Sequence, residues 1–123
     1  MRDAGGGIAT QDYAISETLK KTVSEEIEER LIKNTLDIII LKAVKNGALS
    51  GYGIINFIHR KFAVLLSPGT IYAILYFLER KGLVKASVNQ RARCYSLTEK
   101  GEETLSAILS MQNRIKTFVA NIF

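Results

Sequence analysis

The clearest hydrophobic pattern in the chain lies between residues 67 and 82. Its apolar residues fall at spacings of four and three, which predicts a helix with one buried face: Ile71, Leu75 and Leu78. Ser67 and Pro68 suit the N-cap and the first helical position, and Gly82 suits the position just beyond the C-terminus. Because its first turn carries only small or hydrogen-bonding residues, such a helix is typical of one that inserts its N-terminus into a DNA groove.

The pattern after this helix predicts a β-hairpin with a basic tip. Leu83–Val88 and Cys94–Leu97 are the expected strands, and the polar residues 89–93 form the tip between them. Thr98 then suits the N-cap of a further helix. A helix, a hairpin with a basic tip and another helix make up the back half of a winged helix-turn-helix.

Three segments ahead of residue 67 have helical patterns. Residues 13–33 carry an apolar residue at every fourth position, a narrow stripe that needs a partner surface: Ile15, Leu19, Val23, Ile27 and Leu31. Residues 36–44 are apolar almost all round, which predicts a central helix. Ser50 suits the N-cap of a third helix over residues 51–62, with these residues expected to be buried: Tyr52, Ile55, Ile58 and Phe62.

The order of elements predicts a mainly α fold with a small β-hairpin, a winged helix-turn-helix with N-terminal and C-terminal extension helices. Residues 1–12 contain three consecutive glycines and are expected to form a flexible tail ahead of the extension helix at 13–33. The winged helix-turn-helix DNA-binding domain is then expected over residues 34–98, and a C-terminal dimerisation helix over residues 99–123.

The last helix carries an apolar seam with the spacing of a coiled coil. Its members fall at alternating intervals of three and four: Ile108, Met111, Ile115, Phe118 and Ile122. We expect this seam to join two copies of the chain, because twofold symmetry is the simplest way to engage two DNA half-sites. The alternative is that the helix folds back on its own core or on residues 13–33.

Composition narrows the class of protein. With 123 residues, 47% of them hydrophobic, the chain is expected to form one domain with added terminal helices. It has no run of about 18 apolar residues and no apolar leader segment, so we expect a cytoplasmic protein without a membrane span. Its single cysteine and single histidine exclude an internal disulfide and a four-ligand zinc site within one chain.

Positive charge is concentrated in one part of the chain. The net charge is +5, and residues 59–95 contain seven lysines and arginines against one acidic residue, Glu79. Residues 1–33 are slightly acidic by contrast. Because the basic segment coincides with the predicted helix and hairpin, we interpret it as a surface that faces phosphates. The alternative is that these residues only keep the surface solvated.

Nine residues are candidates for DNA binding: Ser67, Pro68, Gly69, Thr70, Tyr72, Lys61, Lys85, Arg91 and Arg93. Thr70 offers a hydroxyl and a methyl group to base edges, with helix capping as the alternative. The hydroxyl of Tyr72 is expected to reach a phosphate, unless its ring braces the helix pair. The two arginines are expected to contact the DNA backbone from the hairpin tip, unless the tip is merely solvated. Tyr52 is expected in the core rather than at a contact.

No pattern in the chain indicates an enzyme, a metal site or a bound cofactor. His59 has no plausible nucleophile to activate, and Cys94 lies in an expected strand, where packing is the simpler role. The glycines at positions 5–7 precede no strand-to-helix unit, so they do not indicate a phosphate-binding loop.

Three blocks of the chain resemble the PadR-like winged-helix transcriptional regulators. The most specific block is Leu66–Tyr72, and the other two are Leu49–Ile54 and Tyr95–Gly101. The likeness covers roughly residues 34–105. The chain departs from the family pattern at the wing tip and at three positions of the helix, where the family often has proline or polar residues: Ala73, Tyr76 and Phe77.

The resemblance implies a homodimer that binds pseudo-palindromic operator DNA, commonly as a repressor, with the C-terminal helices paired between subunits. In some members a small, often aromatic, ligand releases the DNA, so an aromatic effector is one option for this chain. The alternative, from another class of function, is a winged-helix module for protein–protein assembly in a transcription complex. Such modules often lose the basic face, so the charge of residues 59–95 favours DNA.

Overall fold

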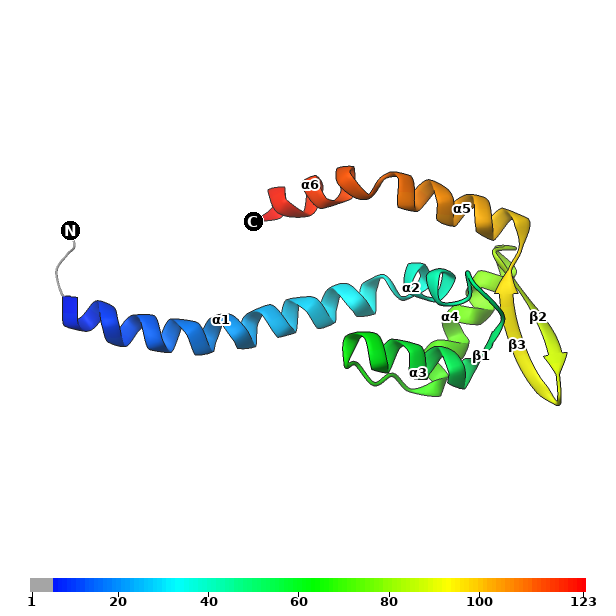
Figure 1. The fold of residues 1–123 in the computed structure, drawn as a ribbon, viewed down its shortest axis with the longest axis horizontal. Coiled ribbons are helices and arrows are strands. Elements are labelled where there is room, and N and C mark those ends of the chain that lie inside the picture. Colours follow the sequence, from blue (N-terminus) through cyan, green and yellow to red (C-terminus); the bar gives the residue numbers. More distant parts are fainter. Residues whose placement is uncertain (1–5) are drawn as a thin grey trace. The chain divides into compact units, whose positions relative to one another are not determined.

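The winged helix-turn-helix expected from the sequence is present. The structure is a computed structural model that describes the backbone of residues 6–123 and the side chains from Ser16 onward. Over this range the chain forms six helices and three strands (Figure 1). The chain divides into two compact units, of which the first ends at Thr35 and the second runs from Leu36 to Phe123. The mainly α fold class with a small antiparallel sheet is confirmed.

The first unit contains one long helix, α1 (Gly6–Asn34). The sequence predicts a tail over 1–12, but residues 6–12 are helical, and residues 1–5 lie outside the described part of the chain. A nucleated helix gains one hydrogen bond for each added residue, and no proline interrupts this one. Neither α1 nor any other helix in the described residues is apolar enough over its length to cross a membrane.

The core of the second unit lies between three helices: α2 (Leu36–Ala43), α3 (Gly51–Phe62) and α4 (Pro68–Arg80). Their inward side chains are at most 2% exposed: Ile40, Leu41, Ile54, Ile58, Ile71, Leu75 and Leu78. Burial of each such side chain stabilises the fold by about 1.5–3 kcal/mol relative to exposure. This shared core therefore fixes the position of α4, whose three predicted buried residues are confirmed.

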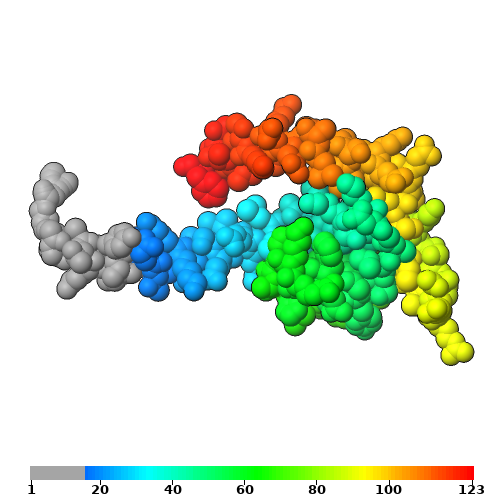
Figure 2. All heavy atoms as spheres, viewed as in Figure 1, coloured from blue at the N-terminus to red at the C-terminus, as the bar shows by residue number. Residues whose placement is uncertain are grey.

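A three-stranded antiparallel sheet completes the second unit, with its strands in the order β1-β3-β2. The predicted hairpin is formed by β2 (Val84–Asn89) and β3 (Ala92–Leu97). The two-residue strand β1 (Leu49–Ser50), which the sequence does not predict, pairs with β3 on its other side. Figure 2 shows the hairpin, in yellow, projecting beyond the packed helices.

The hairpin turn is tighter than the five-residue tip that the sequence predicts. It consists of Gln90 and Arg91 alone, with φ angles of 52° and 70°. Two positive φ angles in succession are the mark of a type I′ turn, whose twist matches that of paired strands. Ala92 and Arg93, which the sequence places in the tip, therefore lie in β3.

The C-terminal segment forms two helices instead of the single helix expected over 99–123: α5 (Glu99–Ser110) and α6 (Gln112–Ile122). At the junction the N–H of Met111 donates to the carbonyl of Ile108 at 3.1 Å. The hydroxyl of Ser110 donates at 2.7 Å to the carbonyl of Ala107, which Met111 would use in a continuous helix. This side-chain bond competes for a carbonyl at the point where α5 ends, whereas a similar bond from Ser24 to the carbonyl of Lys21 leaves α1 continuous.

Candidate nucleic-acid interface

The first turn of α4 is capped by local hydrogen bonds and open to solvent. The Oγ of Ser67 accepts the N–H of Thr70 at 3.2 Å, which confirms the predicted N-cap, and the two hydroxyls lie 2.9 Å apart. Pro68 occupies the first turn, and residues 67–70 are all exposed. The Thr70 hydroxyl thus serves the cap, while the small side chains of the turn and the N–H of Gly69 stay accessible to a ligand.

The other end of α4 is fixed by the backbone. Gly82 has a φ of 76°, in the left-handed region that glycine adopts readily. Its N–H donates to the carbonyl of Glu79, and the N–H of Leu83 donates to the carbonyl of Leu78, both at 3.0 Å. This pair of bonds is a Schellman motif, which confirms the predicted stop and directs the chain into β2.

The first turn of α4 and the hairpin turn lie toward one edge of the second unit. In Figure 1 the chain enters α4 near the lower edge of this unit, and the turn between β2 and β3 extends below the same edge. Arg91 is exposed at that turn, and Lys85 is exposed on β2. In this view the capped end of the helix and the hairpin tip, which carries Arg91, thus both face the lower side of the unit.

The outward surface of α4 combines aromatic rings with positive charge. Tyr76 and Phe77 are 62% and 49% exposed. The guanidinium of Arg80 lies 5.6 Å from the centre of the Tyr76 ring, and the ammonium of Lys81 lies 5.1 Å from that of Phe77. Sequence reasoning assigned these rings no role, although both fall outside the buried stripe of the helix.

Lys61 lies near the end of α3 and is also associated with aromatic rings. Its ammonium lies 5.7 Å from the centre of the Phe57 ring and 5.6 Å from that of Phe62. Attraction between a cation and two ring faces restrains the lysine side chain. The lysine is exposed, so its charge remains available to a phosphate.

Tyr72 braces α4 against α3. A Cβ atom added to Gly51 would overlap the Cζ and Oη atoms of the Tyr72 ring, so the ring lies directly on the glycine backbone. The side chain remains 37% exposed. Its geometry matches the bracing role named as the alternative above, and its phosphate contact stays a prediction.

Tyr52 is 63% exposed, which corrects its expected place in the core. The buried positions of α3 are Gly51, Ile54, Ile55 and Ile58. The buried face therefore includes Gly51, onto which the ring of Tyr72 packs, and Tyr52 is turned to solvent. Phe62, also expected to be buried, is partly exposed.

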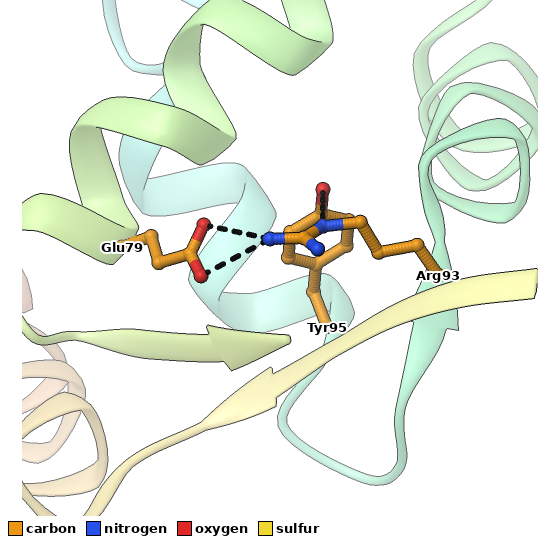
Figure 3. A network of polar contacts seen from close by, with 3 residues as sticks. All are labelled: Glu79, Arg93 and Tyr95. Carbon is orange, nitrogen blue, oxygen red and sulfur yellow. Dashed lines mark hydrogen bonds and ion pairs between the residues drawn. The ribbon is translucent and has the colours of Figure 1, made fainter. Parts of the chain in front are cut away.

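Arg93 lies in β3 and connects the hairpin to α4 (Figure 3). Its Nε donates to the hydroxyl of Tyr95 at 3.1 Å, and one terminal nitrogen lies 3.3 and 3.4 Å from the two carboxylate oxygens of Glu79. The hydrogen bond to Tyr95 and the negative charge of Glu79 raise the pKa of the Arg93 guanidinium. Arg93 therefore lies within β3 and contacts α4, whereas Arg91 lies in the turn; the sequence predicts both at the tip.

The predicted apolar seam spans both C-terminal helices. Ile108 is partly buried on α5. Met111, at the junction, is 44% exposed, and the three seam residues of α6 are exposed by the following fractions: Ile115 45%, Phe118 68% and Ile122 65%. The apolar face of α6 is thus uncovered in the single chain's second unit.

A family model described as the transcriptional regulator PadR-like family matches residues 40–107, more than half of the chain. The transcriptional activator GvpE of Haloferax mediterranei is 27% identical over 111 residues. That alignment covers 90% of this chain but 56% of the relative, so the chain spans little more than half of the relative's length.

Solved structures share the fold. A PadR family transcription regulator from Clostridium difficile superposes with a TM-score of 0.65 at 23% identity, over 72% of this chain and 97% of that one. Bacillus subtilis PadR in complex with operator DNA gives a TM-score of 0.56 at 24% identity, over 61% of this chain and 47% of that one. Together with the family match over residues 40–107, the winged helix-turn-helix shows that the chain belongs to the PadR-like family of transcriptional regulators.

Proposed function

We propose that the chain binds double-stranded DNA as a homodimer and represses transcription from a pseudo-palindromic operator. The observation that carries this proposal is the exposed, capped first turn of α4 at the same edge as the hairpin turn. In winged-helix proteins of this class the start of the recognition helix enters the major groove, and the hairpin follows the DNA backbone. The operator DNA in the Bacillus subtilis PadR structure supports the same use of the fold.

Within this proposal, base reading and backbone contact fall to different residues. Pro68, Gly69 and Thr70 approach base edges, with the Thr70 methyl group suited to a thymine methyl. Lys61, Lys85 and Arg91 contact phosphates, since each presents an exposed positive charge.

Backbone strain supports the role of Arg91. Its φ of 70° is a conformation that glycine adopts without penalty and that costs other residues about 1–2 kcal/mol. An arginine at such a position gives up local stability and places its charge at the outermost point of the hairpin. A phosphate contact is the role that fits this choice of residue.

The uncovered face of α6 supports the dimer. Ile115, Phe118 and Ile122 are each at least 45% exposed, and they fall at spacings of three and four. A second copy that covers this face would place two DNA-binding units about a twofold axis. The resulting protein would require a DNA site with inverted half-sites, separated by about 34–36 Å or a multiple of that distance.

Repression is proposed because it requires only DNA binding, which excludes other proteins from the site. Activation requires a further surface that recruits a partner. The relative GvpE is named an activator, and this chain spans 56% of its length. The competing function, a protein–protein assembly module, is disfavoured by the basic charge of residues 59–95.

The test is selection of bound sequences from a random pool of duplex DNA. We expect enrichment of an inverted repeat, and a mass in light scattering that corresponds to two chains. Ile115→Asp would place a charge in the dimer seam and should leave single chains that no longer select paired half-sites. A monomeric wild-type protein that selects one half-site would refute the dimer, and a pool without enrichment would favour the assembly module.

Two substitutions separate the roles within the surface. Thr70→Ala should reduce the affinity for the selected site by about 1–3 kcal/mol while barely changing the affinity for scrambled DNA. Arg91→Ala should weaken binding to the selected site and to scrambled DNA alike. It should also lower the slope of log affinity against log salt concentration by about one, as expected for one lost phosphate contact. Lys45→Ala, which removes the same charge from the exposed turn after α2, is the control. Addition of small aromatic acids to the same assay tests for an effector.

A further inference from the structure

The hairpin has little support beyond its base. From Ser87 to Arg93 every residue is exposed, so no buried contact fixes the direction of the tip relative to α4. Among the described side-chain hydrogen bonds between this hairpin and a helix, the contact of Arg93 with Glu79 lies nearest the tip. The orientation of the wing therefore depends on this contact.

The guanidinium of Arg93 is held between two partners, Tyr95 and Glu79. Tyr95, which receives its Nε–H, is only 4% exposed and pairs with Leu49 of β1 and Ala86 of β2. The guanidinium also lies 5.7 Å from the centre of the Tyr95 ring. Glu79, on the other side, belongs to the last turn of α4. A buried ring thus orients the arginine toward the helix, which a solvent-exposed ion pair alone would do weakly.

Charge distribution indicates why an acidic residue occurs at this place. Glu79 is the single acidic residue among residues 59–95, and its carboxylate faces Arg93. A carboxylate so close to a phosphate-binding residue would oppose DNA binding, because it repels the same phosphates. The Glu79 carboxylate has a role at this place if Arg93 links the hairpin to the helix and does not contact DNA.

We propose that Arg93 is a positioning residue that ties the wing to α4 through Glu79, so that Arg91 at the tip meets the DNA backbone. This inference rests on the proposed DNA binding for its functional consequence, and it replaces the direct contact that the sequence predicts for Arg93. The geometry of the tie itself is present in the free protein (Figure 3).

Glu79→Gln distinguishes the two roles by the sign of its effect. If Arg93 positions the wing, loss of the carboxylate charge should weaken binding to a short scrambled duplex by about three- to tenfold. If Arg93 contacts phosphate, the same change should strengthen binding, because it frees a positive charge and removes a negative one. Glu103→Gln, which removes an exposed acidic charge from α5, corrects for the change in net charge.

Coupling to the tip gives a second readout. Arg91→Ala should cost less affinity in the Glu79→Gln protein than in wild type, because a loosened wing already presents Arg91 poorly. Additive effects of the two substitutions, or binding that is tighter than in the Glu103→Gln control, would overturn the proposal. The melting midpoint of Glu79→Gln should shift by no more than about 4 °C, since the pair is exposed.

A measurement without DNA separates this inference from the proposed function. Backbone ¹⁵N relaxation should show lower order parameters at Gln90 and Arg91 in Glu79→Gln than in wild type, while those of β1 and α4 stay unchanged. Unchanged order parameters at the tip would overturn the tie even if DNA binds. A protein that fails to bind DNA but loosens its tip on substitution would refute the proposed function alone.

Discussion

The helices α4 and α6 have similar lengths and similar apolar spacing, but the apolar face of α4 is buried and that of α6 is exposed. In α4 the residues Ile71, Leu75 and Leu78 are at most 1% exposed, whereas Ile115 of α6 is 45% exposed. A serine hydroxyl caps the first turn of α4, and α6 has no side-chain cap hydrogen bond. The chain therefore covers the aliphatic stripe of α4 and leaves the apolar face of α6 uncovered within its unit.

This difference teaches what an apolar stripe alone does and does not specify. A spacing of three and four predicts a helix with one buried face, but it does not say whether the covering surface belongs to the same chain. The surface that covers α4 comes from α2 and α3, which follow one another closely in sequence. For α6 the covering surface is proposed to be a second copy.

The largest effect is expected from matched substitutions of one isoleucine in each helix. Ile71→Ala should reduce the free energy of unfolding by about 2–5 kcal/mol, because it opens a cavity in a fully buried site. Ile115→Ala should change the unfolding of the separate chain by no more than about 0.5 kcal/mol. It should instead weaken the rise of the melting midpoint with protein concentration. Both quantities are measurable by thermal denaturation at several concentrations.

Equal losses of stability at both positions, independent of concentration, would break the comparison. They would mean that α6 packs on a surface of its own chain, which is the alternative left open by the sequence. Light scattering on the same samples provides the control for assembly.

A smaller effect is expected where α4 meets α3. Gly51→Ala should reduce stability by about 1–3 kcal/mol, because the new methyl group would overlap the Tyr72 ring and force it aside. A double-mutant cycle with Tyr72→Ala measures the contact, since the glycine substitution should cost little once the ring is absent. A full cost of Gly51→Ala in the absence of the ring would place the strain in α3 itself.

The boundaries of α4 were predictable because local chemistry encodes them. Ser67 and Pro68 specify the start and Gly82 the stop, and the structure shows both the serine cap and the glycine motif. The hairpin was predictable for the same reason, since its strands and polar tip are contiguous. The order of these elements along the chain, expected from the family resemblance, is the order that the structure has.

Features that depend on distant or competing contacts were not predictable. The break at Met111 falls inside an unbroken apolar spacing, so the spacing gives no sign of it. The partner of Arg93 lies 14 residues away, on a helix whose orientation the sequence does not specify. Tyr52 is exposed because the buried face of α3 includes Gly51, where the ring of Tyr72 packs.

A further prediction concerns the backbone at the end of α4. Gly82→Ala should reduce stability by about 1–2 kcal/mol, because an L side chain is strained at a φ of 76°. Its Cβ would come no closer than 4.0 Å to the Lys100 side chain, so the cost is backbone strain and not a clash. Denaturant unfolding measures the loss, and an unchanged midpoint would show that the left-handed conformation does not fix this end of the helix.

The smallest effect is expected at the matching position of α3, which ends on Ala63 with a φ of 57°. Ala63→Gly should release the strain of the left-handed alanine, at the expense of a more flexible unfolded chain, for a net gain below about 1 kcal/mol. The N–H of residue 63 would still donate to the carbonyl of His59, so the helix end is retained. A gain here beside a loss for Gly82→Ala, both measured in denaturant, would show that the same backbone geometry ends both helices. A loss at both positions would instead mean that the added freedom of the unfolded chain outweighs the strain that glycine releases at the exposed position 63.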